Sequence, residues 1–227
     1  MSPVALVTGG SRGLGLALAT ALAERGWSLV IDGRDQAALR EAVNELNRES
    51  VVAIAGDVSD PDHRQQLVVA VDRLGGLDLL VNNASFLGPS PQPRLDSYEL
   101  EVFRQVYEIN VVAPLSLIQV FLPMLRRSHG VVINVTSDAA VEGYEGWGGY
   151  GSSKAALEQL TRVLAAEEPD LSVYWVDPGD MNTRMQQEAF PGEDISDRPP
   201  PEASIPGLLR LIEERPSAGR YQARQQA

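Results

Sequence analysis

Cysteine is absent from this sequence, so the chain can form neither a disulfide nor a thiolate metal site. That absence fits a reducing compartment, and we expect a cytoplasmic location. Basic residues are also few: 19 Lys and Arg stand against 31 Asp and Glu, which gives a formal net charge of −12. A field of this sign repels nucleic acid and anionic lipid, so we do not expect a polyanion-binding function.

Long hydrophobic runs are missing as well. No uninterrupted run approaches the roughly 20 apolar residues that a membrane-spanning helix needs. The opening MSPVALVTGG also lacks the basic segment and long apolar stretch of a signal peptide. We therefore expect no membrane association. Hydrophobic residues still make up 44% of the 227 residues, an ordinary globular composition, and this length favours one large α/β domain over two small ones.

Short β-branched runs alternate with longer helical patterns, which is typical of βαβ units and a parallel sheet. The predicted strands lie at residues 3–10, 27–34, 51–60, 77–85, 130–139 and 171–183. The predicted helices lie at residues 15–26, 35–49, 61–74, 97–126, 150–167 and 203–215. This order predicts a Rossmann-type, doubly wound α/β fold. Residues 1–227 would form one domain around a parallel sheet of about six to seven strands, with helices on both faces.

Local signals refine this pattern. Asp35 is the expected N-cap of the second helix, and Pro114 and Pro123 predict a kink or break in the fourth. The acidic, proline-rich segment 181–201 is expected to form a substrate loop. The last residues, 221–227, are expected to fray.

A glycine-rich turn, TGGSRGLG, joins the first predicted strand to the first helix, with glycines at Gly9, Gly13 and Gly15. Glycines permit a tight turn and a close approach of the backbone to a phosphate, and the free N–H groups at a helix N-terminus attract its charge. This spacing differs from the commoner GxGxxG. Taken alone, the segment is also compatible with a plain strand-to-helix turn.

The residues after the second strand bear on the choice of dinucleotide. A fold that prefers NAD usually carries an acid there to accept from the ribose 2′-OH, whereas this chain has Gly33 and Arg34. Asp32 lies one residue earlier, where strand alternation would point its side chain away from the pocket. Arg34 and Arg12 can bind a 2′-phosphate through charge-assisted hydrogen bonds, so we expect NADP(H). The alternative is two solvated surface arginines.

Seven motifs follow one another along the chain: TGGSRGLG, GDVSD, NNAS, EIN, NVTS, YGSSK and DPGDMNT. In this order and at these intervals they resemble the short-chain dehydrogenase/reductase family in its standard single-domain form, over residues 4 to about 183. The resemblance implies hydride transfer between NADP(H) and a carbonyl or alcohol substrate. It implies no metal, and His63 and His129 stand apart from the implied site.

The resemblance implies four catalytic residues. Tyr150 would give a proton to the substrate oxygen as hydride reaches the carbon, and Ser137 would hydrogen-bond that oxygen. Lys154, one helical turn after Tyr150, would lower the phenol pKa from about 10 and bind the nicotinamide ribose. Asn110 would hold a water that joins Lys154 to solvent. Each residue taken singly has a structural alternative: a turn cap for Ser137, a satisfied helix amide for Asn110, and surface positions for Tyr150 and Lys154.

The resemblance also implies cofactor contacts after the carboxyl ends of the strands. Asp57 and Val58 would meet the adenine, 82–84 would line its ribose, and Pro178-Gly179 with Thr183 would border the nicotinamide, a simple turn being the alternative for Pro178-Gly179. Thr8 would be a structural hydroxyl that links neighbouring strand ends. The full expected set is Gly9, Ser11, Arg12, Gly13, Leu14, Gly15, Arg34, Asp57, Val58, Asn83, Ala84, Tyr150, Lys154, Pro178, Gly179 and Thr183.

Three features depart from the family pattern. Ser85 stands where a glycine is usual. Asp138 follows Ser137; facing the pocket it would disfavour anionic substrates, and capping the turn it would not. The C-terminus lacks the stretch that many tetrameric members use for assembly, so we expect a homodimer formed through helices 97–126 and 150–167.

The loops after the later strands indicate a substrate class. Their apolar and aromatic residues suit a small hydrophobic aldehyde or ketone. These residues are Phe86, Leu87, Pro89, Val141, Tyr144, Trp147, Met181, Met185 and Phe190. Two other functions stay open: an NADP(H)-binding regulator or sensor on the same fold, and epimerisation or dehydration with bound cofactor.

Overall fold

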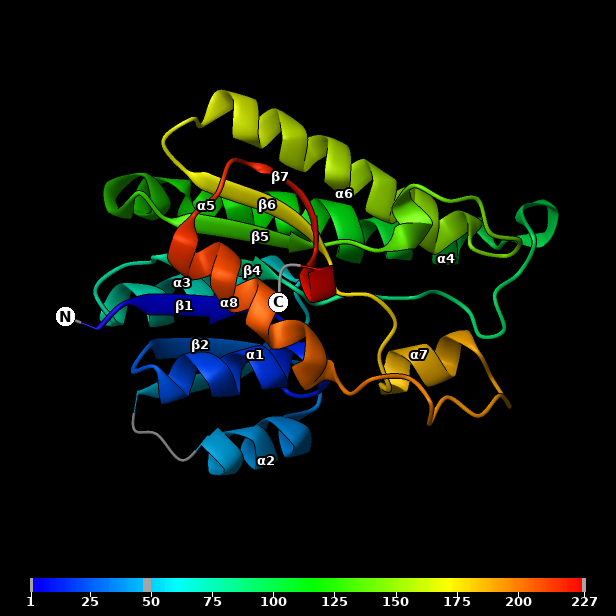
Figure 1. The fold of residues 1–227 in the computed structure, drawn as a ribbon, viewed down its shortest axis with the longest axis horizontal. Helices are drawn as coiled ribbons and strands as arrows, with labels where there is room; N and C mark the ends of the chain where they lie inside the picture. The colour runs from blue at the N-terminus through cyan, green and yellow to red at the C-terminus, as the bar shows by residue number, and fades with distance from the viewer. Residues whose placement is uncertain (1, 47–49, 226–227) are drawn as a thin grey trace.

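The computed structural model describes residues 2–46 and 50–225. Its strands form a seven-stranded parallel sheet in the order β3-β2-β1-β4-β5-β6-β7 (Figure 1). The predicted doubly wound α/β fold is confirmed. The strands are β1 (Val4–Val7), β2 (Ser28–Gly33), β3 (Val51–Ala55), β4 (Leu79–Asn82), β5 (Val131–Val135), β6 (Ser172–Asp177) and β7 (Gly219–Gln222).

Helices cover both faces of the sheet, because the buried strands carry apolar residues on both sides. Along β1, Ala5 and Val7 pack against one group of helices, while Val4 and Leu6 pack against the other. The first group is α1 (Gly13–Glu24), α2 (Gln36–Leu46) and α8 (Ile205–Glu214). The second group is α3 (Pro61–Arg73), α5 (Ala113–Ser128) and α6 (Gly148–Glu167). Figure 1 shows α1 and α8 side by side over the sheet.

The helix predicted over 97–126 is interrupted. A short η1 (Leu95–Ser97) precedes α4 (Leu100–Tyr107), and a π-helical turn, η2 (Glu108–Val112), separates α4 from α5. Pro114 lies in the first turn of α5, where its missing N–H costs little, and Pro123 lies inside α5 without ending it. The predicted break therefore occurs just before Pro114.

The combined helical stretch Leu100–Ser128 is long and apolar enough to cross a membrane by length and composition, and an 18-residue window within it has a mean hydropathy of 1.6. The sequence expectation considered only uninterrupted apolar runs, and a window that tolerates a few polar residues does reach this limit. Half of the apolar window is buried inside the protein. Phe121 and Leu125 are fully buried against the sheet, as in the core helix of a globular protein.

The segments around the later strands add shorter elements. The predicted substrate loop contains α7 (Arg184–Ala189), and the helix predicted over 203–215 is α8, preceded by η4 (Pro201–Ser204). After β5 comes η3 (Asp138–Ala140). Asp35 accepts from the N–H groups of Ala37 and Ala38 at 3.0 and 3.2 Å, so it caps α2 as expected. The predicted end of that helix, 47–49, lies outside the described residues.

The C-terminal segment is ordered, and the prediction that it frays is wrong for residues 221–225. β7 pairs in parallel with β6, and η5 (Ala223–Gln225) follows it. Ala223 is fully buried, and a Cβ added to Gly207 of α8 would meet its carbonyl oxygen at 1.8 Å. This close approach fixes the segment beside the carboxyl ends of the strands (Figure 1).

Candidate active site

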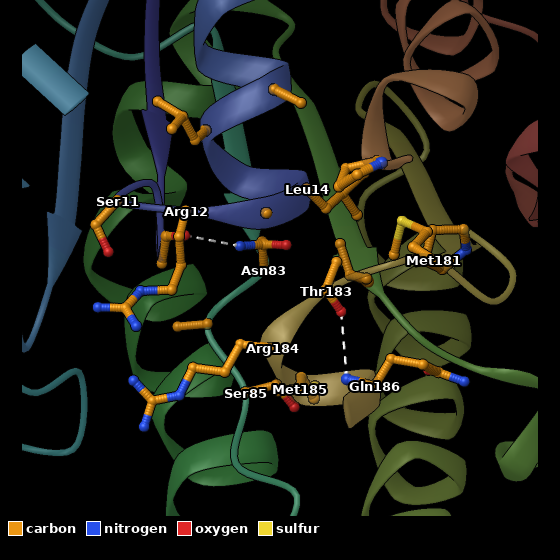
Figure 2. A pocket seen from close by; sticks show the side chains of 18 of the residues that line it. Ser11, Arg12, Leu14, Asn83, Ser85, Met181, Thr183, Arg184, Met185 and Gln186 are labelled. Atoms are coloured by element: carbon orange, nitrogen blue, oxygen red, sulfur yellow. Dashed lines mark hydrogen bonds between the residues drawn. The ribbon is translucent and has the colours of Figure 1, made fainter. Parts of the chain in front are cut away.

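A cleft of about 1300 Å³ lies at the carboxyl ends of the parallel strands, the usual position of ligand sites in this architecture. It brings together every predicted catalytic and cofactor residue except Gly15, Asn82 and Asn110, which are not part of its lining. In Figure 2, Ser11, Arg12 and Leu14 of the glycine turn lie across from Met181 and Thr183 of the loop after β6. A Cβ added to Gly13 would lie 3.6 Å from Thr183 Cγ2.

The glycine turn has the backbone geometry of an anion cradle. Gly9 and Gly13 adopt positive φ angles of 65° and 54°, and a Cβ at Gly15 would meet the Gly9 carbonyl oxygen at 2.3 Å. α1 begins at Gly13, and within the described residues no side-chain hydrogen bond from Arg12 caps it. The first N–H groups of α1 thus remain available for a phosphate.

Two buried side chains, Asp32 and His63, support this turn. Asp32 accepts from Gly9 N at 2.7 Å, and its second oxygen lies 3.0 Å from His63 Nε2. Both side chains are about 98% buried or more. Asp32 is therefore occupied within the protein, and His63, which we expected to lie apart from the site, supports the cofactor cradle. Nothing in the local sequence pattern pairs these residues, which are 31 positions apart.

Thr8 and Asn83 connect the turn to the next strand. Thr8 Oγ1 donates to Val81 O at 3.2 Å and accepts from Asn83 N and Ala84 N, both at 3.0 Å. This is the structural position expected for Thr8. The Asn83 amide donates to the Thr8 and Gly9 carbonyls at 2.8 and 3.2 Å, so its Nδ2 supports the turn.

Asn82 does not lie where the sequence placed it. It was expected to line the adenine ribose with its two neighbours. Instead its Nδ2 donates to Asn134 Oδ1 at 2.7 Å, and only 2% of the residue is exposed. Its side chain lies on the face of the sheet that α6 covers, where Asn134 in turn donates to Thr161 of that helix.

The adenosine end of the cleft presents two arginines. Arg12 Nη2 lies 2.9 Å from Asp35, and Arg34 Nη1 lies 4.0 Å from Asp57. The Arg12 and Arg34 side chains are 42% and 64% exposed, so these ion pairs contribute about 1 kcal/mol or less and can exchange for a ligand. Asp57 Oδ1 accepts from Ser59 N and Oγ at 2.9 and 2.7 Å. Two exposed guanidinium groups are thus available to a ligand at this end of the cleft.

At the other end, Tyr150 and Lys154 lie in the first turns of α6. Lys154 is the only lysine in the sequence. Its Nζ donates to Val135 O at 2.8 Å and lies 5.5 Å from the centre of the Tyr150 ring. Burial lowers the pKa of Lys154 to about 7, so its ammonium loses its proton near neutral pH.

The environment of Tyr150 differs from the expected one. Burial raises the pKa of Tyr150 above its ordinary value, hydrogen bonding with Ser85 opposes the rise, and the carboxylates of Asp177 and Asp138 add to it. The expected lowering by the Lys154 charge is not found among these causes. Burial penalises the ammonium of Lys154 as it penalises phenolate. Ser85, where the family has glycine, is thus close to the phenol.

Ser137 and Asp138 form a hydrogen-bonded pair. Ser137 Oγ donates to Asp138 Oδ1 at 2.9 Å and accepts from Ala139 N at 3.2 Å. Asp138 also accepts from Ala139 N at 2.8 Å and from the Tyr144 hydroxyl at 3.0 Å. Since Asp138 also lines the cleft, it both caps the turn and places a carboxylate in the cleft beside Ser137.

Asn110 is fully buried in the π-helical turn. Its Oδ1 accepts from Ser85 Oγ and Phe86 N, and its Nδ2 donates to Phe86 O and Ser153 Oγ, all within 3.1 Å. These four bonds use the whole capacity of the amide. Asn110 therefore joins the loop after β4 to α6. The water that Asn110 was expected to hold toward Lys154 would have to bind the backbone of Asn110, because its side chain is fully used.

Apolar side chains line the space beside Tyr150. The Trp147 ring meets Tyr150 edge-on at 5.8 Å and Phe190 at 5.9 Å, and Met185 of α7 packs on the same cluster. The predicted wall residues in the cleft are Phe86, Leu87, Trp147, Met181 and Met185, whereas Pro89, Val141, Tyr144 and Phe190 lie outside its lining. In the described part of the chain, no group of three or more His, Asp or Glu is arranged to hold a metal ion.

Comparisons with known proteins agree with this geometry. The family model for short chain dehydrogenases matches residues 3–194. L-fucose dehydrogenase from Mus musculus is 35% identical over 188 residues, covering 82% of this chain and 67% of that protein. Benzil reductase ((S)-benzoin forming) from Saccharomyces cerevisiae is 32% identical over 197 residues, covering 83% and 75%.

Solved structures give the same result over nearly the full length. A chain from Shigella flexneri, described as a short chain dehydrogenase and solved in complex with NADP, superposes with a TM-score of 0.90 at 30% identity. The match covers 97% of this chain and 96% of that chain. The family model, the curated relatives and the fold agree, and the protein belongs to the short-chain dehydrogenase/reductase family of oxidoreductases.

Proposed function

We propose that this protein is an NADP(H)-dependent oxidoreductase that interconverts a small hydrophobic aldehyde or ketone and the corresponding alcohol. One observation carries the proposal. Tyr150, Lys154 and Ser137 converge at one end of a cleft whose other end presents a glycine turn and two exposed arginines. The cleft is thus able to hold a dinucleotide with its reactive ring beside a proton donor.

The residues at the reaction end have complementary roles. Bound NADPH would supply hydride to the carbonyl carbon. Tyr150 Oη would give its proton to the carbonyl oxygen, and Ser137 would donate a hydrogen bond to that oxygen after releasing Asp138. Lys154, with its pKa lowered to about 7 by burial, would exchange a proton at neutral pH and so help to restore the phenol.

Arg12 and Arg34 support NADP(H) over NAD(H). Both side chains are exposed at the end of β2, where a 2′-phosphate would lie. Of the acids near this position, Asp32 is already bonded to Gly9 and His63. Asp35 and Asp57 pair with the two arginines themselves. The NADP complex of the Shigella flexneri protein, of similar fold, supports the same cofactor.

The wall beside Tyr150 supports a hydrophobic substrate. Trp147, Met181 and Met185 offer apolar surface, beside the Tyr150 and Ser137 hydroxyls that would bind one substrate oxygen. The names of the two relatives, a sugar dehydrogenase and a diketone reductase, support the exchange of alcohol and carbonyl groups in general.

The test is oxidation of NADPH by purified protein across a panel of aldehydes, ketones and quinones, followed by the loss of reduced-nicotinamide absorbance. Tyr150→Phe is the matched control, because it keeps the ring and removes the proton. We expect turnover by the parent and a loss of about 10²-fold to 10⁴-fold in the variant, with NADPH still bound. Full turnover by Tyr150→Phe would refute the assignment.

We further propose a homodimer through α4, α5 and α6. Leu100, Val112, Leu115 and Val120 are exposed apolar side chains along the first two elements and the turn between them, and Val163 is exposed on α6. Packing these side chains against a second copy would remove apolar surface from water, which favours association. Light scattering is expected to give twice the chain mass, and Val120→Asp is expected to lower it. A monomeric parent would overturn the proposal.

A further inference from the structure

We propose that Arg220 and Arg224, at the C-terminal end of the described chain, are positioning residues of the active site. They hold the loops after β5 and β6, which carry Ser137 and the expected nicotinamide contacts. This inference rests on the proposed oxidoreductase function. Arg224 lies in the segment 221–227 that was predicted to fray, and Arg220 directly precedes that segment.

Arg220 of β7 joins three elements with one guanidinium. Its Nε donates to Glu158 Oε1 at 2.9 Å, and its Nη2 donates to the Ser137 carbonyl at 3.1 Å and to Asp177 Oδ2 at 3.4 Å. The side chain is 22% exposed. The backbone of the predicted catalytic serine is thus fixed to β6 and α6 by a residue 83 positions away.

Glu158 explains why a cation is required here. It lies one helical turn after Lys154 on α6 and is 1% exposed. Its Oε1 also accepts from Thr136 Oγ1 at 2.9 Å, and its Oε2 lies 3.2 Å from Arg162. A buried carboxylate is costly unless it is paired and hydrogen-bonded, so Glu158 holds Arg220 in place beside Ser137.

Arg220 also balances the charge of Asp177. This carboxylate lines the cleft, and burial raises its pKa, while a hydrogen bond from Gly179 N and the Arg220 charge oppose the rise. The groups that face Tyr150 are Lys154 on α6, Asp138 on η3, Asp177 on β6 and the Ser85 hydroxyl. Arg220 reaches the phenol only through Asp177.

Arg224 acts on the neighbouring loop. Its Nε donates to the Pro178 carbonyl at 3.2 Å, and its Nη2 donates to the Asp180 carbonyl at 2.9 Å. Gly179 has a φ of 73°, and a Cβ there would lie 1.8 Å from Arg224 Nη2. Ser204 Oγ donates to the same Pro178 carbonyl at 2.7 Å. The loop therefore needs glycine at 179 and the guanidinium above it.

The decisive experiment compares Arg220→Met with Arg162→Met. Arg162 pairs with the same Glu158 but donates to neither Ser137 nor Asp177, so it controls for loss of an ion pair. Misplacement of a reacting group by about 1 Å costs about 10²-fold. We expect Arg220→Met to lose about 10-fold to 100-fold in kcat with the Kd for NADPH unchanged, and Arg162→Met to stay near the parent.

The pH profile separates positioning from stability. Alcohol oxidation requires ionised Tyr150, so its rate rises with pH through the apparent pKa of that group. In Arg220→Met, the unpaired Asp177 carboxylate raises this pKa, and the midpoint moves to higher pH. Adding Asp177→Asn to Arg220→Met is expected to return the midpoint to its position in the parent. A kcat loss with an unmoved midpoint, or an equal loss in Arg162→Met, would overturn the inference.

Two further variants keep the test decisive. If Arg220→Met does not fold, Arg220→Lys retains one charge but cannot bond all three acceptors, and we expect a parent-like midpoint with reduced kcat. A parent-like kcat in Arg220→Lys would overturn the inference. Arg224→Gln, which affects backbone carbonyls alone, is expected to raise the KM for NADPH without moving the midpoint; an unchanged KM would remove Arg224 from the proposal.

Hydrogen exchange, which does not depend on turnover, tests this inference separately from the proposed function. Hydrogen exchange is measured in NADPH-containing solution over residues 136–140 and 178–180. Arg220→Met and Arg224→Gln are expected to speed exchange in these two segments, and Arg162→Met to leave it unchanged. If the parent reduces no carbonyl, the proposed function fails while exchange still tests the positioning. Equal exchange in all variants would overturn the inference.

Discussion

The two ends of the cleft differ in how they hold charge. At the adenosine end, Arg12 and Arg34 lie in water and make ion pairs that a ligand can replace. At the reaction end, Lys154, Glu158 and Asp177 are 95% buried or more and are tied to fixed partners. Exposed charge is suited to selecting a ligand, whereas buried charge sets the proton affinity of its neighbours.

The largest expected effect belongs to the buried end. Because Lys154 is the only lysine, protein labelled at lysine Cε gives one NMR resonance for the side chain. We expect it to titrate at about pH 7, far below the ordinary value of about 10.4. A midpoint near the ordinary value would contradict the comparison, since Lys154 would then behave as an exposed group.

The same shift has a consequence for stability. Between the folded pKa of about 7 and the unfolded value of about 10.4, the unfolded chain binds more protons at Lys154 than the folded protein. The contribution of this group to the free energy of unfolding therefore rises with pH across that window.

The exposed end is tested by Arg34→Gln. Loss of one charge-assisted contact is expected to weaken NADPH binding by about 10-fold to 100-fold and to leave NADH binding unchanged. Fluorescence titration with each cofactor measures both affinities. Arg40→Gln, on α2 and outside the cleft lining, is the matched control. Equal weakening of NADH binding would mean that Arg34 does not bind the 2′-phosphate.

Asp138→Asn tests a carboxylate that is exposed, like the charges at one end of the cleft, but has fixed partners, like those at the other. It lines the cleft but is exposed, and it accepts from Ser137 and Tyr144. Asparagine keeps an acceptor and removes the charge. We expect carboxylate-bearing carbonyl substrates to gain several-fold, about 1 kcal/mol, in kcat/KM relative to neutral ones. No change in this ratio would leave Asp138 as a turn cap alone.

The smallest effect is expected from Ser85→Gly, which restores the residue usual in the family. The Ser85 hydroxyl opposes the rise in the pKa of Tyr150, so its removal raises that pKa further. The pH profile of alcohol oxidation is expected to move to higher pH by a fraction of a unit. A shift to lower pH would show that Ser85 favours the protonated phenol.

The main architecture could be predicted because its signals are local. Apolar runs of four to six residues gave the first six strands, and the glycine turn and the Tyr150–Lys154 spacing gave the two ends of the cleft. β7 was missed because GRYQ is short, has no apolar run and pairs with β6 alone. Strands at a sheet edge carry little hydrophobic signal of their own.

The supporting contacts could not be predicted because they join distant parts of the chain. Asp32 meets His63 across 31 positions, and Arg220 meets Ser137 across 83. Burial gave the opposite sign to the expected pKa of Tyr150, and burial depends on the packed fold rather than on spacing along a helix. The sequence predicted which groups react, and the structure was needed to identify what holds them.

The place of β7 also sets the order in which the site is completed during synthesis. A ribosome makes the glycine turn, Ser137, Tyr150 and Lys154 before it reaches Arg220 and Arg224. A nascent chain that has emerged only to residue 215 already carries the cofactor cradle and the reacting groups, but it lacks the side chains that fix the two loops. The reaction end is therefore the last part of the cleft to mature as the chain leaves the ribosome.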